Sequence, residues 1–253
     1  MTLSVISIGI IFNALACGFV SAIALALVIF LHGRWAHLDL AMKAFTWFWL
    51  FTSLIWAFSS IRYILTGFGY TGQLIGYLDI NVQAAVFFGG PSLFYYVILR
   101  VFKSKRLANI LAVISFILGL ISLWFVLSPN GLPVRDVTDF STDSTINSTS
   151  FAIFSVQISV LIFLLLYNII SGWRYWRQDQ NQSFLYESLY SLSILVYVIL
   201  GSIDESKIIT GWPLIAFRLL YSGSFLFAYL VIMQDEEAQR TYFADEQLRP
   251  AAT

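Results

Sequence analysis

The chain has 253 residues, of which 59% are hydrophobic, 17% are aromatic and only 11% are charged. An ordinary soluble domain carries about 25% charged residues, and a water-soluble globule of this size cannot hide so much apolar surface. The composition therefore predicts an integral membrane protein in contact with the lipid bilayer, without room for a folded catalytic domain outside it. Fourteen Lys and Arg balance fourteen Asp and Glu, so no electrostatic attraction to nucleic acid is expected.

Seven apolar segments follow one another along the chain, each long enough to cross a bilayer at ~20 residues per crossing. Backbone polar groups cannot stay unpaired in hydrocarbon, and no segment alternates with period two, so the segments are expected to be α-helices. We predict an all-α, seven-helix transmembrane bundle over residues 1–234 and a short acidic tail over 235–253. The segments cover about 4–31, 44–65, 80–102, 107–128, 151–172, 185–203 and 213–234.

Basic residues gather in alternate connections between these segments. The first, third and fifth connections carry Arg34, Lys43, Arg100, Lys103, Lys105, Arg106, Arg174 and Arg177. The connections on the other side carry only Arg135 and Lys207. Because basic loops stay on the cytoplasmic side, the pattern predicts an outer N-terminus and an inner C-terminus.

The first segment carries small residues at four-residue spacing: Ala14, Gly18, Ala22 and Ala26. Such a stripe lets another backbone approach closely, either within the bundle or from a partner subunit, and both interpretations stay open. Cys17 is the single cysteine and is expected to act as a small packing residue. His32 and His37 both lie at or just beyond the end of this segment, so no pair from facing helices is expected to hold a haem or a metal.

The third segment contains Gly89-Gly90-Pro91 near its middle. Pro91 cannot donate a hydrogen bond to the carbonyl of Phe87, so we predict a kink there. A kink either shapes a cavity or simply fits the helices together. The connection over residues 129–150 is rich in Ser, Thr and Asp and cannot form a core, so it is either a solvated loop or a lid over an outer cavity.

Polar side chains inside the apolar segments are the most informative feature, since a charge there costs ~2.5–3.5 kcal/mol on insertion scales. They are expected within about 12 Å of the outer interface at 1.5 Å rise per residue. In one interpretation, Arg62 and Arg218 bind a carboxylate or phosphate in an outward-facing pocket. The remaining ligand-binding candidates are Gln83, Gln157 and Asn13. In the other interpretation the arginines form ion pairs with Asp79 and with Asp204 or Glu205.

Motifs for enzymatic chemistry are lacking: the sequence has no Gly-rich phosphate loop, nucleophile elbow or zinc-protease helix, so we expect no enzyme and no cofactor. The seven-helix arrangement resembles that of microbial rhodopsins, which attach retinal to a lysine in the seventh helix. The polar candidates at that place here are Arg218, Ser222 and Ser224, so no retinal Schiff base is expected.

A second resemblance rests on the run from Lys43 to Trp56, on Gly89-Gly90-Pro91, and on the basic turn Arg100-Val-Phe-Lys103-Ser-Lys105-Arg106 before a plain apolar segment. In these features residues 4–234 resemble the seven-helix membrane sensor regions of bacterial histidine kinases and diguanylate cyclases. The resemblance implies signal detection at a bacterial inner membrane. After Gln234 only 19 residues follow, beginning Asp235-Glu236-Glu237, so a signal is expected to pass to another chain, for which this acidic tail is a candidate docking segment.

Our first hypothesis is therefore a non-enzymatic membrane sensor or accessory subunit that binds a small amphipathic or anionic ligand in the outward-facing pocket. A transporter or channel is the first alternative. A structural or pigment-binding subunit of a larger membrane complex is the second, favoured by the 23 Phe, 13 Tyr and 8 Trp.

Overall fold

The computed structural model describes residues 8–70, 72–128, 134–145, 147–205 and 208–248, with side chains except at 134–137, 143–145, 205 and 236–248. It is a bundle of seven helices, each long and apolar enough to cross a membrane, which confirms the predicted all-α architecture. The helices are α1 (Ile8–His32), α2 (Leu40–Gly67), α3 (Gln73–Phe102), α4 (Lys105–Leu127), α5 (Ser148–Asp179), α6 (Gln182–Glu205) and α7 (Trp212–Leu248). Two short strands, β1 (Val134–Val137) and β2 (Thr142–Thr145), pair as an antiparallel hairpin between α4 and α5.

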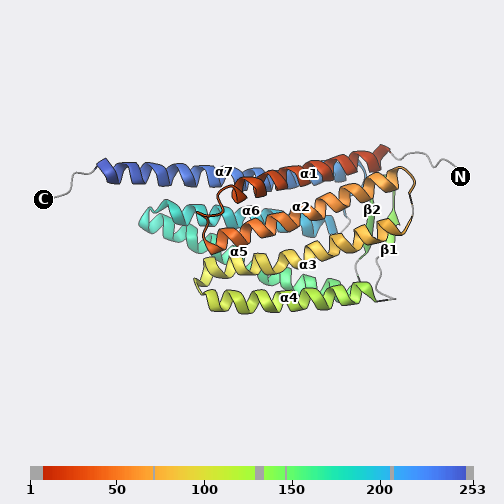
Figure 1. The fold of residues 1–253 in the computed structure, drawn as a ribbon, viewed down its shortest axis with the longest axis horizontal. Helices are drawn as coiled ribbons and strands as arrows, with labels where there is room; N and C mark the ends of the chain where they lie inside the picture. Colours follow the sequence, from red (N-terminus) through yellow and green to blue (C-terminus); the bar gives the residue numbers. More distant parts are fainter. Residues whose placement is uncertain (1–7, 71, 129–133, 146, 206–207, 249–253) are drawn as a thin grey trace.

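The helices form two layers (Figure 1). Helices α1 to α4 lie side by side in chain order, and α5, α6 and α7 form the second layer behind them. The layers touch mainly at their edges, where α7 packs on α1 and α5 packs on α3 and α4. We call the end of the bundle that carries β1 and β2 the hairpin end, and the opposite end, which carries the basic connections, the basic end.

Several helix boundaries follow from capping side chains. Asp39 Oδ1 accepts from the Met42 amide at 2.7 Å, Ser104 Oγ from the Leu107 amide and Asn147 Oδ1 from the Thr149 amide. Each thereby pairs an amide that the first helical turn would leave unpaired. Helices α2 to α7 are longer than the predicted spans, because these caps and the polar turns lie beyond the apolar core of each segment. The first predicted span also includes residues 4–7, which lie outside the described part of the chain.

Helix α3 continues through Pro91 without a break in its helical assignment. The Phe87 carbonyl, which Pro91 cannot pair, faces α4 at Gly119, where an added Cβ would lie 3.2 Å from that oxygen. Glycine therefore allows the close approach of α4 at this point. The predicted kink stays a prediction, while Gly89 and Gly90 line the cavity described below.

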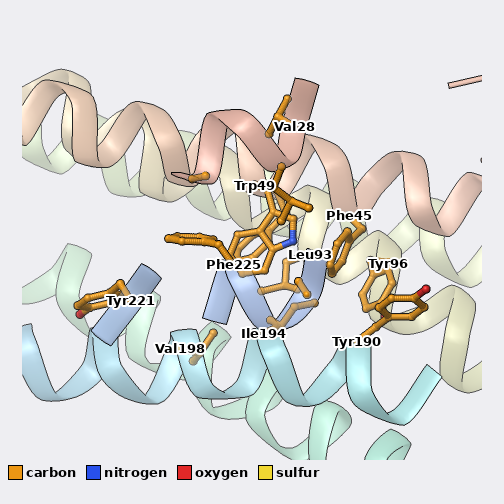
Figure 2. Packing of buried hydrophobic residues seen from close by; sticks show 14 of the residues in the cluster. Val28, Phe45, Trp49, Leu93, Tyr96, Tyr190, Ile194, Val198, Tyr221 and Phe225 are labelled. Carbon is orange, nitrogen blue, oxygen red and sulfur yellow. The ribbon is translucent and has the colours of Figure 1, made fainter. Parts of the chain in front are cut away.

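Large aromatic side chains fill the space between the layers in the basic half (Figure 2). Trp49 of α2 packs edge-on against Phe225 of α7 at 4.8 Å between ring centroids, and against Tyr197 of α6 at 5.5 Å. Phe45, Tyr96 and Tyr190 continue the cluster toward the basic end. Edge-to-face pairs of this kind contribute about 0.5–1.5 kcal/mol beyond area burial. The basic half is thus held by a dense aromatic core.

The connection between α4 and α5 differs from its prediction. Rather than a wholly solvated loop, its described residues form the hairpin, in which Thr142 is fully buried and the Phe140 ring packs on Trp212 at 5.2 Å. The Phe140 carbonyl accepts from Asn13 Nδ2 of α1 at 2.7 Å. Composition does not reveal this structure, because it is held by strand pairing and by contacts of Phe140 with residues distant in the sequence.

The small-residue stripe of α1 does not form one packing face. Ala14 is buried and Gly18 faces the Ser60 hydroxyl of α2, whereas Ala22 and Ala26 are exposed on the outside of the bundle. A step of four residues is longer than the 3.6-residue turn, so a stripe at that spacing drifts around the helix. The buried face of α1 instead alternates steps of three and four residues and includes Cys17.

The residues after Gln234 continue α7 as helix to Leu248, well past the membrane-competent segment Trp212–Asp235. The helix has 37 residues and is therefore about 55 Å long at ~1.5 Å per residue. It extends beyond the other helices at the basic end (Figure 1). The start of the predicted tail is thus helical, continuous with the last membrane helix.

Candidate ligand site

Arg218 of α7 ties four helices together near the hairpin end. Its guanidinium donates to both carboxylate oxygens of Asp204 on α6, at 3.1 Å each. It also donates to Asn13 Oδ1 of α1 at 3.0 Å and to the Tyr63 hydroxyl of α2 at 2.6 Å. Asn13 in turn donates to the Phe140 carbonyl, so the network reaches the hairpin. A bidentate, charge-assisted pair of this kind fixes both distance and orientation of its helices.

Arg62 of α2 forms the second buried ion pair, with Asp79 of α3. The side chains are 5% and 2% exposed. The ring of Tyr63 lies beneath both guanidiniums, at 5.0 Å from Arg62 and 5.4 Å from Arg218. The cationic groups thus have carboxylate partners and a shared aromatic face, as charges inside a membrane protein require.

A cavity of about 470 Å³ lies next to these pairs in the hairpin half. It is lined from α2, α3, α5 and α6, with Arg218 and Tyr221 from α7 and Cys17 from α1. Trp56, Tyr197 and Tyr221 separate it from the aromatic core, with Trp56 and Tyr221 at 4.5 Å between ring centroids. Its volume falls within the range of about 300–1,000 Å³ that is typical of small-molecule sites.

The cavity exists because α5 and α6 diverge. At the basic end the two helices touch, with the Gly172 backbone against Ser188 and Asn168 Nδ2 donating to Ser191 Oγ at 2.7 Å. At the hairpin end α5 bonds to α4, where Ser150 Oγ donates to the Ser122 carbonyl. There α6 bonds instead to α7 through Asp204.

This divergence leaves a lateral opening between α5 and α6. The exposed side chains among the cavity's lining come from these two helices: Phe151, Ser159 and Ser202. The cavity therefore reaches the surface of the bundle along these two helices.

Gln83 of α3 lies in the cavity wall with an unsatisfied acceptor. The residue is 6% exposed, and its buried Oε1 has no hydrogen-bond partner. A buried polar atom left without a partner costs about 1–3 kcal/mol, and native structures keep few of them. In a pocket wall such an atom marks the point where a ligand's donor would bind.

The structure brings together three of the five predicted ligand-binding residues: Arg62, Gln83 and Arg218 all line the cavity. Gln157 does not, because Ser115 Oγ of α4 donates to its Oε1 at 2.7 Å. Asn13 lies behind the cavity wall as a partner of Arg218. The two ion pairs are those of the alternative interpretation, with Asp79 and Asp204 as partners, while the side chain of Glu205 lies outside the described ones.

Sequence reasoning missed the residues that complete the site. Tyr63 follows Arg62 directly but reads as one more interfacial aromatic, and Phe140 contributes only its carbonyl. Ser115 lies in an apolar run without any neighbouring polar residue. None of the hairpin residues whose side chains are described lines the cavity, and the lid interpretation of this connection stays a prediction.

Among the described residues there is no cluster of three or more His, Cys, Asp or Glu side chains that could hold a metal ion. No family model matches the sequence, and no curated protein matches it. The seven membrane-length helices define the class of this protein, an integral multi-pass membrane protein. Beyond that class, its function has to be argued from the cavity and the ion-pair network.

Proposed function

We propose that this protein is a non-enzymatic sensor or accessory subunit of the membrane, which binds an amphipathic small molecule in the cavity between α2, α3, α5 and α6. The observation that carries the proposal is the buried, partnerless Oε1 of Gln83 in the wall of a 470 Å³ cavity. An apolar wall with a few convergent polar groups is typical of a binding site. The resemblance to bacterial sensor regions supports the same function in an inner membrane.

The ion-pair network supplies a route from the cavity to the outside of the bundle. Arg218 and Asp204 both line the cavity, and Arg218 holds α7 against α1, α2 and α6. A ligand that contacts this pair in only one arrangement of the helices would shift the population toward that arrangement. Because α7 continues as one helix beyond the basic end, its displacement would be available to a partner protein there.

Transport is the alternative from a different class. Conduction needs polar groups at successive depths. Below the cavity floor, the aromatic side chains around Trp49, Phe225 and Phe45 pack with aliphatic ones such as Leu93 and Ile194 (Figure 2). This filled basic half favours binding over passage. Solute flux into proteoliposomes would reverse that preference.

The proposal is tested by filling the cavity. Gly201 of α6 lines it, and an added Cβ would meet nothing closer than the Tyr221 hydroxyl at 4.0 Å. Gly201→Leu should therefore occupy the cavity, and it removes a glycine from a helix, so folding should survive. The matched control is Gly223→Leu on the exposed face of α7, where an added Cβ has no neighbour within 4 Å.

The readout is saturable binding of radiolabelled dodecanol and dodecanoate to the protein in nanodiscs, corrected with empty nanodiscs. We expect the native protein and Gly223→Leu to bind at least one of the two probes saturably, and Gly201→Leu to lose that binding. Equal binding by all three proteins, or no saturable binding by the native protein, would contradict the proposed site.

A further inference from the structure

The two arginines at the cavity bring no net positive charge to it. Arg62 is paired with Asp79, and Arg218 is paired with Asp204, whose side chain is 14% exposed. An incoming carboxylate or phosphate would have to displace one of these carboxylates into a poorly solvated space, where an unpaired charge is very unfavourable. The polar end of a fitting ligand is therefore uncharged.

The polar end must also be a hydrogen-bond donor. Gln83 Oε1 is the acceptor among the buried polar atoms without a partner in the described part of the cavity lining. An ether or ester oxygen cannot satisfy it, whereas a hydroxyl can. Gln157, the neighbouring buried amide, shows the same pairing inside the protein, since the Ser115 hydroxyl donates to its Oε1.

The rest of the ligand must be apolar. Much of the lining is apolar, with side chains such as Phe154 and Ile158 of α5, and Trp56 and Tyr221 form the floor. The exposed residues of the cavity lining, Phe151, Ser159 and Ser202, lie on α5 and α6, the two helices along which the cavity reaches the surface of the bundle. A molecule that already dissolves in the bilayer could enter there without crossing water.

Resting on the proposed function, we infer that the cavity takes an uncharged membrane-soluble alcohol, which enters between α5 and α6 and donates its hydroxyl to Gln83 Oε1. Two kinds of membrane molecule share this chemistry: an aliphatic alcohol, and an aromatic diol of the hydroquinone type whose flat ring would stack on the aromatic floor.

The experiment compares one probe at a time between the native protein and Gln83→Met, which keeps the length of the side chain and removes the acceptor. The probes are dodecanol, dodecyl methyl ether and dodecanoate, with decylhydroquinone and its dimethyl ether as the aromatic arm. A given probe partitions equally into the lipid of both preparations. The ratio of its dissociation constants for the native protein and for Gln83→Met is therefore independent of partitioning. Gln157→Met is the matched control, a buried glutamine already paired with Ser115 and outside the cavity lining.

We expect Gln83→Met to weaken binding of an alcohol about tenfold, the scale of one buried hydrogen bond lost. Binding of the matching ether should not change, and Gln157→Met should bind every probe as the native protein does. A tenfold effect confined to dodecanol assigns an aliphatic alcohol, and one confined to decylhydroquinone assigns an aromatic diol. Either result supports the inference.

Two results would overturn the inference while leaving the proposed function intact. One is saturable alcohol binding that Gln83→Met leaves unchanged. The other is dodecanoate that binds more tightly than dodecanol and displaces it, which would mean that the cavity takes an anion after all. Loss of saturable binding for every probe in the native protein would instead remove the cavity as a site, and both proposals with it.

Discussion

The helices are held together by aromatic packing in one half of this bundle and by ion pairs in the other. In the basic half, α2, α6 and α7 are separated by rings that fill the space, with Trp49 fully buried among Phe45, Tyr197 and Phe225. In the hairpin half, one ion pair links α2 to α3 and another links α7 to α6, and a cavity remains beside them. Packed rings fix the arrangement of neighbouring helices through the fit of their shapes. Ion pairs fix it through the direction of their hydrogen bonds, and they do not require the space beside them to be filled.

This difference indicates where the bundle is rigid and where it can respond. An aromatic core loses contacts outright when its helices separate, because dispersion falls steeply with distance. An ion-pair network can exchange one partner for another at lower cost, and Arg218 already has partners on three other helices. We expect damage to each half to have a different signature.

The largest expected effect is the removal of one partner from the Arg218 pair. Arg218→Met leaves the largely buried Asp204, whose side chain is 14% exposed, without its cation. It should lower the free energy of unfolding by about 3 kcal/mol, the lower end for broken buried pairs. The measurement is denaturant unfolding in mixed micelles. The double variant Arg218→Met with Asp204→Leu should recover most of the loss, because no unpaired charge remains.

The control for that experiment is Arg177→Met, since Arg177 is exposed near the basic end of α5. It should change stability by no more than about 0.5 kcal/mol. A double variant as unstable as the single one would mean that Arg218 acts by packing rather than by charge, and the contrast between the halves would lose its basis.

In the basic half, the loss of stability should depend on the volume of the side chain that a substitution removes. Trp49→Ala removes a fully buried ring and should cost about 3 kcal/mol, the lower end for large-to-small core substitutions. Trp47 lies two residues away and is 48% exposed, so Trp47→Ala should leave the free energy of unfolding nearly unchanged. The measurement is the same denaturant unfolding. A large effect of Trp47→Ala would contradict the assignment of Trp49 to the buried face of α2 and Trp47 to the exposed one.

The contact between α5 and α6 at the basic end is tested by a smaller change. An added Cβ at Gly172 would lie 2.3 Å from Ser188 Oγ and 2.9 Å from the Phe184 carbonyl, so the helices would have to move apart. Gly172→Ala should cost about 1–2 kcal/mol despite the better helix propensity of alanine. Gly223→Ala, whose added Cβ meets no atom within 4 Å, should be neutral or slightly stabilising. A loss as large as that of Gly172→Ala would mean that the effect at Gly172 does not come from its contact with α6.

The smallest expected effect concerns the link from the network to the hairpin. Asn13→Ala removes the hydrogen bond to the Phe140 carbonyl and one of the bonds to Arg218, and should cost about 1 kcal/mol. Amide hydrogen exchange at Phe140 and Ser141 should accelerate. Asn81→Ala is the matched control, because its exposed side chain bonds only within α3. Unchanged exchange in Asn13→Ala would mean that the hairpin is held by the Phe140 ring alone.

Hydropathy predicted the number and type of elements because a membrane imposes one rule on every segment, which is that its backbone must be paired within a helix of sufficient length. The same rule hides which face of a helix points inward. Helix α1 is apolar all round, so the stripe that includes Ala22 and Ala26 was as plausible a packing face as the one through Cys17.

The candidate site was predictable in its members and not in its connections. Arg62, Gln83 and Arg218 stood out because polar groups are costly in hydrocarbon. Their partners did not: Gln157 bonds to Ser115 on a neighbouring helix, and the Tyr63 hydroxyl accepts from Arg218 across 155 positions in the chain. Such pairings depend on the rotation and tilt of each helix, which no periodicity in these segments encodes.

The sequence by itself determined a seven-helix membrane protein with its basic connections at one end, because length, hydropathy and charge are additive along the chain. The tertiary structure decided the rest: that α5 leans toward α4 while α6 leans toward α7, that a cavity opens between them, and that Gln83 faces it without a partner. The physical reason is that helix packing and hydrogen bonding depend on the relative orientation of whole elements, which exists only once all of them have folded together.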